Sequence, residues 1–216
     1  MKVPLLELTR QYDEIKEELE PKILDILRSG WYILGPNVKG FEREAAAFVG
    51  SDFGIGLNSG TDALRVALRH AGIGPGDEVI TTPFTYFATA EVISELGAHP
   101  VFCDIDPETF NIDPESAADS ISPRTAAIVP VHLFGLMADM GPVMKLAEEH
   151  ELFVLEDACQ AVGSDFPAGK AGSAGHAAAF SFFPSKNLGA AGDGGLLTTD
   201  IEELDTLARS LRMHGV

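Results

Sequence analysis

Phe180-Ser-Phe-Phe-Pro-Ser-Lys-Asn-Leu-Gly-Ala-Ala-Gly-Asp-Gly-Gly195 is a stretch in which an apolar run meets a glycine-rich loop. The apolar run, residues 177–183, ends at Pro184, and Lys186 follows it with four glycines behind. Glycine lets a backbone adopt positive φ and approach other groups closely. A lysine at the mouth of an apolar strand can be partly desolvated, which gives access to the neutral amine that Schiff-base chemistry needs. A surface lysine in a glycine-rich turn would have the same local sequence, so this stretch alone leaves both interpretations open.

Short apolar segments alternate with helical patterns along most of the chain. The expected strands are residues 54–57, 78–82, 100–105, 126–133, 152–155, 178–182 and 195–199. Alternation of this kind predicts an α/β fold of three layers, in which helices cover both faces of a mostly parallel, seven-stranded sheet. No helical pattern separates the last two strands, so we expect one of them to run antiparallel to the rest.

Helical periodicity opens and closes the chain. Apolar residues recur at three- to four-residue spacing from Tyr12 to Leu27, and Pro21 within this pattern predicts two shorter helices or a kink. A second helix over residues 38–48 completes an N-terminal helical segment of about 50 residues. Asp200 and Glu203 have the spacing of a capping box at the start of a last helix, residues 201–211.

Composition excludes several classes of protein. A chain of 216 residues with 45% apolar residues can form one globular domain with a sizeable core. Its formal charge of −18 argues against nucleic acid as a partner, because no basic stripe is present. Cys103 and Cys159 form no CxxC pair, so we expect small core residues and neither a disulfide nor a zinc site. The sequence has no signal peptide pattern and no apolar run that could span a bilayer, so we expect a cytoplasmic protein.

Candidate site residues follow the predicted strands, where ligands bind in open α/β sheets. They are Ser59, Gly60 and Thr61 after one strand, Tyr86 after a second, Asp157 and Gln160 after a third, and Ser181 and Lys186 at a fourth. Ser-Gly-Thr at the start of a helix could bind phosphate through free N–H groups, or Ser59 could simply be an N-cap. A carboxylate at the end of an apolar strand is costly to bury unpaired, which favours a site role for Asp157 over helix capping. Tyr86 could equally pack in the core, and a core role is favoured for His132, which we place on a strand.

A lysine, a strand-end aspartate, an aromatic residue and a phosphate-binding helix start together match what pyridoxal phosphate requires. The chain resembles the DegT/DnrJ/EryC1/StrS family of pyridoxal-phosphate sugar aminotransferases, which have the aspartate-aminotransferase fold. The stretches that carry this resemblance are collinear and cover the chain: Trp31–Pro36, Asn58–Leu64, Gly72–Val79, Pro130–Gly135, Glu156–Ala161 and Phe180–Gly195. One departure is His176, where relatives often have aspartate, and this change puts the local loop contacts in question.

The resemblance implies a role for each matching residue. Lys186 would bind the cofactor covalently and act as general acid and base at the substrate carbon. Asp157 would pair with the pyridinium nitrogen, Tyr86 would stack on the ring, and Gln160 would lie near its face or phenolic oxygen. The phosphate would be held by the helix start and the lysine strand, that is by Ser59, Gly60, Thr61 and Ser181.

The resemblance also implies a reaction and a larger assembly. An amino donor, usually glutamate, would load the cofactor, and the amine would pass to a keto group at C3 or C4 of a nucleotide-linked deoxysugar. Residues 1–216 would form the large domain of a homodimer. Family members continue past this point with a small domain that completes the site. Three alternatives stay open: a sugar dehydratase, against which Lys186 argues because those relatives have histidine; an aminotransferase for cyclitols or amino-hydroxybenzoate precursors; and a non-catalytic fragment.

Overall fold

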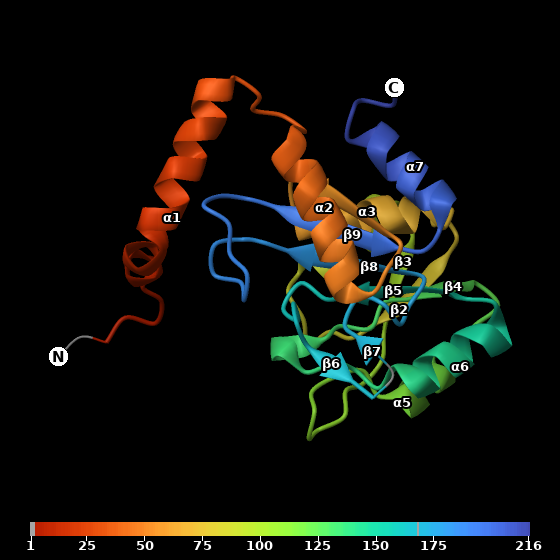
Figure 1. Ribbon diagram of the computed structural model, residues 1–216. Helices are drawn as coiled ribbons and strands as arrows, with labels where there is room; N and C mark the ends of the chain where they lie inside the picture. The colour runs from red at the N-terminus through yellow and green to blue at the C-terminus, as the bar shows by residue number, and fades with distance from the viewer. Residues whose placement is uncertain (1–2, 168) are drawn as a thin grey trace. The chain divides into compact units, whose positions relative to one another are not determined.

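Figure 1 presents the computed structural model of the protein, which describes residues 3–167 and 169–216. The chain divides into two compact units, the first ending at Phe41 and the second comprising Glu42–Val216. Helix α2 (Pro36–Val49) crosses this boundary. The units are described one at a time, beginning with the smaller.

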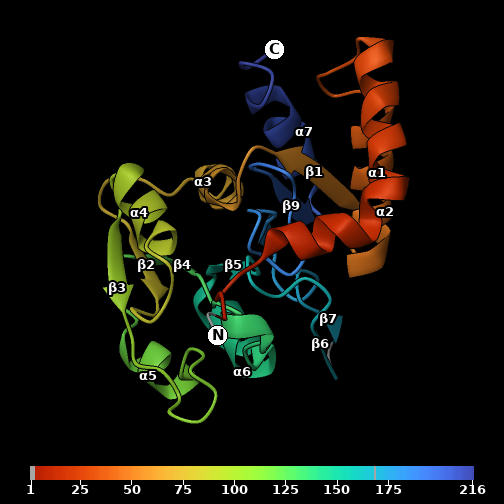
Figure 2. The same ribbon diagram turned by 90° about the vertical axis from the view of Figure 1, so that its left-hand side faces the viewer.

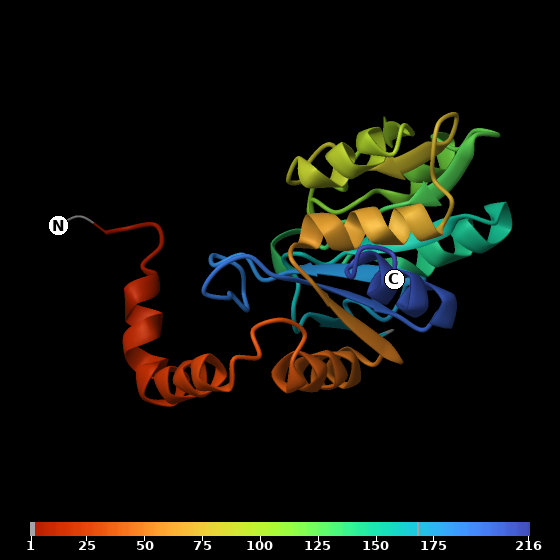
Figure 3. The same cartoon turned by 90° about the horizontal axis from the view of Figure 1, so that it is seen from above.

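The first unit is dominated by helix α1 (Leu8–Ser29), a single helix with Pro21 inside it. The ribbon of α1 changes direction part-way along, which confirms the predicted kink (Figure 3). Proline cannot donate the backbone hydrogen bond of its position, and its ring crowds the preceding turn, so the helix bends there. Gly30 ends α1 in the left-handed conformation, at φ 68°, that commonly terminates helices.

The second unit contains the expected seven-stranded sheet, with strand order β1-β9-β8-β5-β4-β2-β3 among the described residues. The strands are β1 (Phe53–Leu57), β2 (Glu78–Thr81), β3 (His99–Phe102), β4 (Thr125–Ile128), β5 (Phe153–Asp157), β8 (Ala177–Ser181) and β9 (Gly195–Thr199). Strand β9 is antiparallel to both its neighbours, whereas the pairs β8–β5, β5–β4, β4–β2 and β2–β3 are parallel. The fold class is therefore confirmed, and β9 is the antiparallel strand.

Helices cover both faces of this sheet, with α3 and α7 on one side of the strands and α5 and α6 on the other (Figures 1 and 2). Their bounds are α3 (Gly60–His70), α4 (Ala88–Glu95), α5 (Pro114–Asp119), α6 (Met140–His150) and α7 (Glu202–Leu211). Alternate residues of a strand point to opposite faces. In β8, Ala177 and Ala179 accordingly pack with α3, α4 and α7, while Ala178 and Phe180 join the core on the α5–α6 side.

Three predicted details are wrong. The fourth strand ends at Ile128 rather than residue 133, and His132 lies beyond it, just before the 3₁₀ turn η1 (Leu133–Gly135). Pro130 has no N–H to continue the ladder, which accounts for the early end. The last helix has no side-chain cap, because the Asp200 carboxylate accepts instead from the Asp52 N–H at 2.8 Å. The structure also has elements that the patterns did not predict: α5, the turn η1, and a short hairpin of β6 (Asp165–Phe166) and β7 (Gly169–Lys170).

Strands β1, β2, β4, β5 and β8 run in the same direction, so their carboxyl ends meet at one edge of the sheet. Candidate residues that follow different strands are therefore brought together there. Among the described residues no helix is both long enough and apolar enough to cross a membrane.

Candidate functional site

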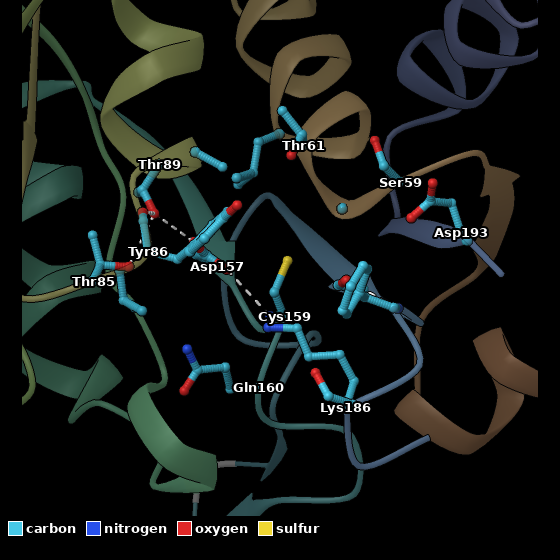
Figure 4. A pocket seen from close by; sticks show the side chains of 18 residues that line it. Ser59, Thr61, Thr85, Tyr86, Thr89, Asp157, Cys159, Gln160, Lys186 and Asp193 are labelled. Atoms are coloured by element: carbon cyan, nitrogen blue, oxygen red, sulfur yellow. Dashed lines mark hydrogen bonds between the residues drawn. The ribbon is translucent and has the colours of Figure 1, made fainter. Parts of the chain in front are cut away.

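A pocket of about 420 Å³ opens at the carboxyl edge of the sheet (Figure 4). Its lining includes every residue that the sequence predicted for the site: Ser59, Gly60, Thr61, Tyr86, Asp157, Gln160, Ser181 and Lys186. These residues come from four separate segments, and strand direction brings them to one place. The predicted grouping is therefore present, and the individual roles remain proposals.

The start of α3 forms one wall of the pocket. Ser59 is its N-cap and accepts a hydrogen bond from the Asp62 N–H at 3.1 Å, as the alternative interpretation of this residue predicted. The N–H groups of Gly60 and Thr61, however, have no hydrogen-bond partner among the described residues. Free amides and the positive end of the helix dipole together attract an anion, so capping and anion binding are compatible at this helix start.

Two glycines allow the backbone to pack closely at this wall. A Cβ atom on Gly60 would lie 2.6 Å from the Cys159 sulfur, and one on Gly195 would overlap the carbonyl group of Ser59. Only glycine fits at such approaches. The glycine run after Lys186 thus has a structural purpose, because it lets the start of β9 lie directly against the start of α3.

Asp157 forms the floor of the pocket at the end of β5, where it is only 6% exposed. Its Oδ2 accepts from the Thr89 hydroxyl at 2.8 Å, and its Oδ1 accepts from the Cys159 N–H at 3.2 Å (Figure 4). The backbone of Asp157 is fixed as well, since its N–H donates to the Pro130 carbonyl at 2.9 Å and its own carbonyl accepts from the His132 N–H at 3.0 Å. The carboxylate is therefore held in one orientation by both oxygens.

Lys186 lies half-buried in the loop between β8 and β9. The loop is closed by backbone hydrogen bonds of 2.8 Å from the Lys186 N–H to the Phe183 carbonyl and from the Ala190 N–H to the Phe182 carbonyl. No ion pair with Lys186 occurs among the described residues. An amine in a pocket without a paired carboxylate is available for other chemistry.

Cys159 lines the same pocket, whereas the sequence predicted a core residue; that prediction holds for Cys103, which is buried. Burial raises the pKa of the Cys159 thiol well above its ordinary value of 9.0, the negative charge and hydrogen bonding of Asp157 raise it further, and the Lys186 charge acts in the opposite direction. The thiol is thus protonated at neutral pH, which makes it a poor nucleophile.

Gln160 and Tyr86 complete the opposite side. The Gln160 side-chain oxygen accepts from the Phe134 N–H at 2.9 Å, which leaves the amide NH₂ as the group free to donate. Phe134 itself has a positive φ of 54°, an uncommon conformation for a non-glycine residue. Tyr86 is 72% exposed, so its ring is not a core residue within this chain. Ser181, by contrast, uses its oxygen to accept from the Phe183 N–H at 3.3 Å.

His132 is fully buried beside the site and is satisfied there, as predicted. Its Nδ1 accepts from the Ala138 N–H at 3.1 Å, so the ring proton is on Nε2 and is donated to Glu156 at 2.7 Å. Burial raises the pKa of Glu156, but the hydrogen bond from His132 and those from the Gly175 and Gly172 N–H groups outweigh it and lower the pKa below 4.5.

His176, the departure noted in the sequence, makes contacts of its own. Its Nδ1 accepts from the Val154 N–H at 2.8 Å, and its ring stacks on Phe153 with 5.2 Å between centroids. Burial lowers the pKa of His176 below 6.5. The histidine thus extends the β5–β8 pairing through its side chain and needs to be neutral to do so.

Sequence reasoning missed several polar residues of the pocket, namely Thr85, Thr89, Ser185 and Asp193. Thr85 lies in the loop between β2 and α4, next to Tyr86, and Thr89 lies in the first turn of α4; the position of this segment directly after a strand is the signal that could have identified them. No group of three or more His, Cys, Asp or Glu side chains that could hold a metal ion occurs among the described residues.

A profile of the DegT/DnrJ/EryC1/StrS aminotransferase family matches residues 13–216. The chain belongs to this family. Family membership agrees with the motifs in the sequence, four of which contribute residues to the pocket lining: Asn58–Leu64, Pro130–Gly135, Glu156–Ala161 and Phe180–Gly195.

Similar proteins include two curated members of the DegT/DnrJ/EryC1/StrS family. The chain is 49% identical over 215 residues to a pleiotropic regulatory protein of Geobacillus stearothermophilus, covering 100% of this chain and 58% of that protein. It is 46% identical over 213 residues to the UDP-N-acetyl-3-dehydro-α-D-glucosamine 3-aminotransferase of Acidithiobacillus ferrooxidans, covering 99% and 58%. The chain therefore spans a little over half the length of these relatives.

Two solved members of the family have the same fold. Streptomyces venezuelae DesV in complex with a ketimine intermediate superimposes with a TM-score of 0.96 at 45% identity, over 100% of this chain and 58% of DesV. NtdA from Bacillus subtilis with bound cofactor PMP superimposes with a TM-score of 0.91 at 34% identity, over 97% of this chain and 47% of NtdA.

Proposed function

We propose that the protein is a pyridoxal-phosphate-dependent aminotransferase that moves an amino group from glutamate to the keto group of a nucleotide-linked deoxysugar. The observation that carries this proposal is the pocket itself. It combines an unpaired lysine, a buried carboxylate held by both oxygens, and a helix start with free N–H groups. A family in which a solved member carries PMP adds independent support.

The donor set of the pocket fits pyridoxal phosphate. The free amides of Gly60 and Thr61, with the Thr61 hydroxyl, would bind the phosphate group. Asp157 offers an ionised carboxylate for a protonated ring nitrogen, and Gln160 offers an NH₂ donor for a ring oxygen.

Pyridoxal phosphate, when bound, supplies an electron sink for carbon–hydrogen bond cleavage and carries the amino group from donor to acceptor. The protein's part is to orient and to move protons. Lys186 would hold the cofactor and then carry a proton to and from the substrate carbon, as a general acid and base. Asp157 would keep a proton on the ring nitrogen, because an opposite charge beside a cation favours the charged form. Tyr86 would stack on the ring, and Ser181 would help to hold the phosphate.

Support for a nucleotide-sugar substrate comes from a relative. The Acidithiobacillus ferrooxidans relative is named for a UDP-linked 3-keto sugar, and we extend that substrate class, with amination at C3, to this protein. The aminated nucleotide sugar would be used in the biosynthesis of cell-surface polysaccharides or secondary metabolites. The presence of Lys186 argues against the dehydratase alternative.

We also propose how the whole protein is organised. Residues 1–216 would be its cofactor-binding large domain, acting in the cytoplasm as part of a homodimer. Helix α1 exposes an apolar stripe that a second subunit could cover, made of Leu8, Tyr12, Ile15, Ile23, Leu24 and Leu27. Exposed apolar stripes of this kind are typical of subunit interfaces.

The test is to locate the cofactor on the full-length protein. Added pyridoxal phosphate should produce a new absorbance band, and borohydride reduction should fix the label on the peptide that contains Lys186. Lys186→Arg should abolish the band and reduce turnover at least about 100-fold, since general acid–base catalysis alone contributes about 10²–10⁴-fold. Lys145→Arg and Lys170→Arg are the matched controls and should change neither. Labelling at Lys145 or Lys170, or no release of 2-oxoglutarate from glutamate with a UDP-linked 3-keto sugar, would contradict the proposal.

A further inference from the structure

Thr89 is a buried hydroxyl that points at the Asp157 carboxylate. It lies in the first turn of α4, is 1% exposed, and places its Oγ1 2.8 Å from Asp157 Oδ2. The two residues are 68 positions apart in sequence, so the contact depends on the sheet and not on a local turn. A buried hydroxyl beside an ionised carboxylate donates a short, charge-assisted hydrogen bond.

The directions of the hydrogen bonds around Thr89 follow from its single proton. Its Oγ1 also lies 3.0 Å from Thr85 Oγ1 and 3.2 Å from the Tyr86 carbonyl. The carboxylate is the nearest and the only charged acceptor, so the proton of Thr89 is donated to Asp157. Thr85 must then donate to Thr89, which gives a chain of two hydroxyls that ends on Asp157.

This chain of hydroxyls joins two parts of the proposed cofactor site. The Cys159 N–H holds Oδ1 of Asp157 from the β5 side, and Thr89 holds Oδ2 from the α4 side (Figure 4). The Thr89 N–H also donates to the Tyr86 carbonyl at 3.2 Å, so one helical turn fixes both the Tyr86 backbone and the carboxylate. Removing the hydroxyl would leave a buried carboxylate oxygen without its donor and free the carboxylate to rotate.

We propose that Thr89, supported by Thr85, is a positioning residue that orients the Asp157 carboxylate toward the ring nitrogen of the cofactor. This inference rests on the proposed function. It assigns Thr89 no contact with substrate: its effect passes entirely through Asp157. A carboxylate that has lost its orientation holds the ring proton less well, and the electron sink weakens accordingly.

Four variants of the full-length protein test the role. Thr89→Val keeps the shape and removes the hydroxyl, Thr89→Ser keeps the hydroxyl, and Thr85→Val removes the second member of the chain. Thr198→Val is the matched control, because the Thr198 hydroxyl is equally buried but donates to the Gly172 carbonyl at 3.0 Å, outside the pocket lining. The readouts are kcat and KM separately, and the pH at which the absorbance band of added pyridoxal phosphate titrates.

In Thr89→Val we expect kcat to fall about 10- to 100-fold with a smaller change in KM. A loss of this size is typical when a residue is removed that orients a group in direct contact with a cofactor. The absorbance transition should move to higher pH by about one unit, because loss of positive charge on the ring lets the lysine-linked nitrogen keep its proton longer. Thr89→Ser should restore most of both quantities, Thr85→Val should shift both in the same direction but less, and Thr198→Val should match the wild type.

Three results would overturn the proposal: an unshifted transition in Thr89→Val, a Thr89→Ser variant as impaired as Thr89→Val, or an equal shift in Thr198→Val. If Thr89→Val does not fold, Thr85→Val and Thr89→Ser decide the matter by the same two readouts. A wild-type protein that gives no band with pyridoxal phosphate would refute the proposed function, and the role of Thr89 would fall with it. The two failures are thus distinguishable.

Discussion

Glu156 and Asp157 are consecutive carboxylates at the end of the same strand, yet they have different surroundings. Asp157 faces the pocket and accepts two hydrogen bonds, one on each oxygen. Glu156 faces the other side of the sheet, is completely buried, and accepts four, from His132 and from the N–H groups of Gly172, Ala174 and Gly175. Each of its oxygens therefore has two donors.

The difference separates a carboxylate that stabilises the fold from one that is available to a ligand. Glu156 fixes the loop before β8 to β5 and has no lone pair left for anything else. Asp157 is held firmly enough to have one orientation but keeps acceptor capacity in the pocket. Residual acceptor capacity, more than burial, distinguishes the site residue, because both carboxylates are buried.

Replacing Asp157 by Asn should give the largest effect on catalysis. The amide cannot hold a proton on a ring nitrogen by charge, so turnover should fall by roughly 100-fold or more while pyridoxal phosphate still binds measurably. Steady-state turnover and cofactor titration of the full-length protein measure this. Glu156→Gln, the same change one residue earlier, is the control and should retain turnover within about tenfold once folded. Near wild-type turnover in Asp157→Asn would assign the role to another residue.

Glu156→Gln should instead reduce stability. One amide oxygen cannot accept all four hydrogen bonds, and the amide NH₂ would face backbone N–H groups, so we expect a loss of about 3 kcal/mol in the free energy of unfolding. Urea unfolding followed by circular dichroism measures it. Glu78→Gln is the comparison, since Glu78 is also buried but pairs with the exposed Arg124 and with Ser122; it should cost about 1 kcal/mol. Equal losses would remove the distinction drawn for Glu156.

His176→Asn should give the smallest effect, confined to a window of pH. Burial lowers the pKa of His176 in the folded protein below its unfolded value of 6.5. The stability that depends on its neutral form is therefore present above pH 6.5 and is lost as the pH falls through the folded pKa. Asparagine can accept from the Val154 N–H without titrating. The free energy of unfolding of the variant should therefore not show this fall with decreasing pH.

The same unfolding measurement at lower pH reports on Glu156 instead of His176. The pKa of Glu156 is lowered, so its contribution is present above pH 4.5 and declines only below it, in wild type and in His176→Asn alike. Urea unfolding at intervals between about pH 7 and pH 4 separates the two windows. Identical profiles for wild type and His176→Asn between pH 6.5 and 5 would contradict the assignment for His176.

Much of this arrangement could be predicted because it depends on local pattern. Alternating apolar segments and helical periodicity specified the three-layer fold. They misplaced the end of the fourth strand, which Pro130 stops before His132, and they did not predict α5 or the β6–β7 hairpin. The eight candidate residues lie at carboxyl ends of strands, and parallel strands bring such ends to one edge whatever their order. The run of glycines after Lys186 and the acidic pair on β5 can likewise be recognised in the local sequence alone.

What a segment meets across the sheet was decided by the tertiary structure alone. Nothing in residues 85–89 indicates that a threonine there will donate to Asp157, 68 positions away, because that contact requires β2 and β5 to lie on either side of β4. Likewise, the strand period of two says that Glu156 and Asp157 face opposite ways, but not which one faces the pocket. Strand order and packing settle that, since they determine which face receives the Gly172–Gly175 loop and which receives α4.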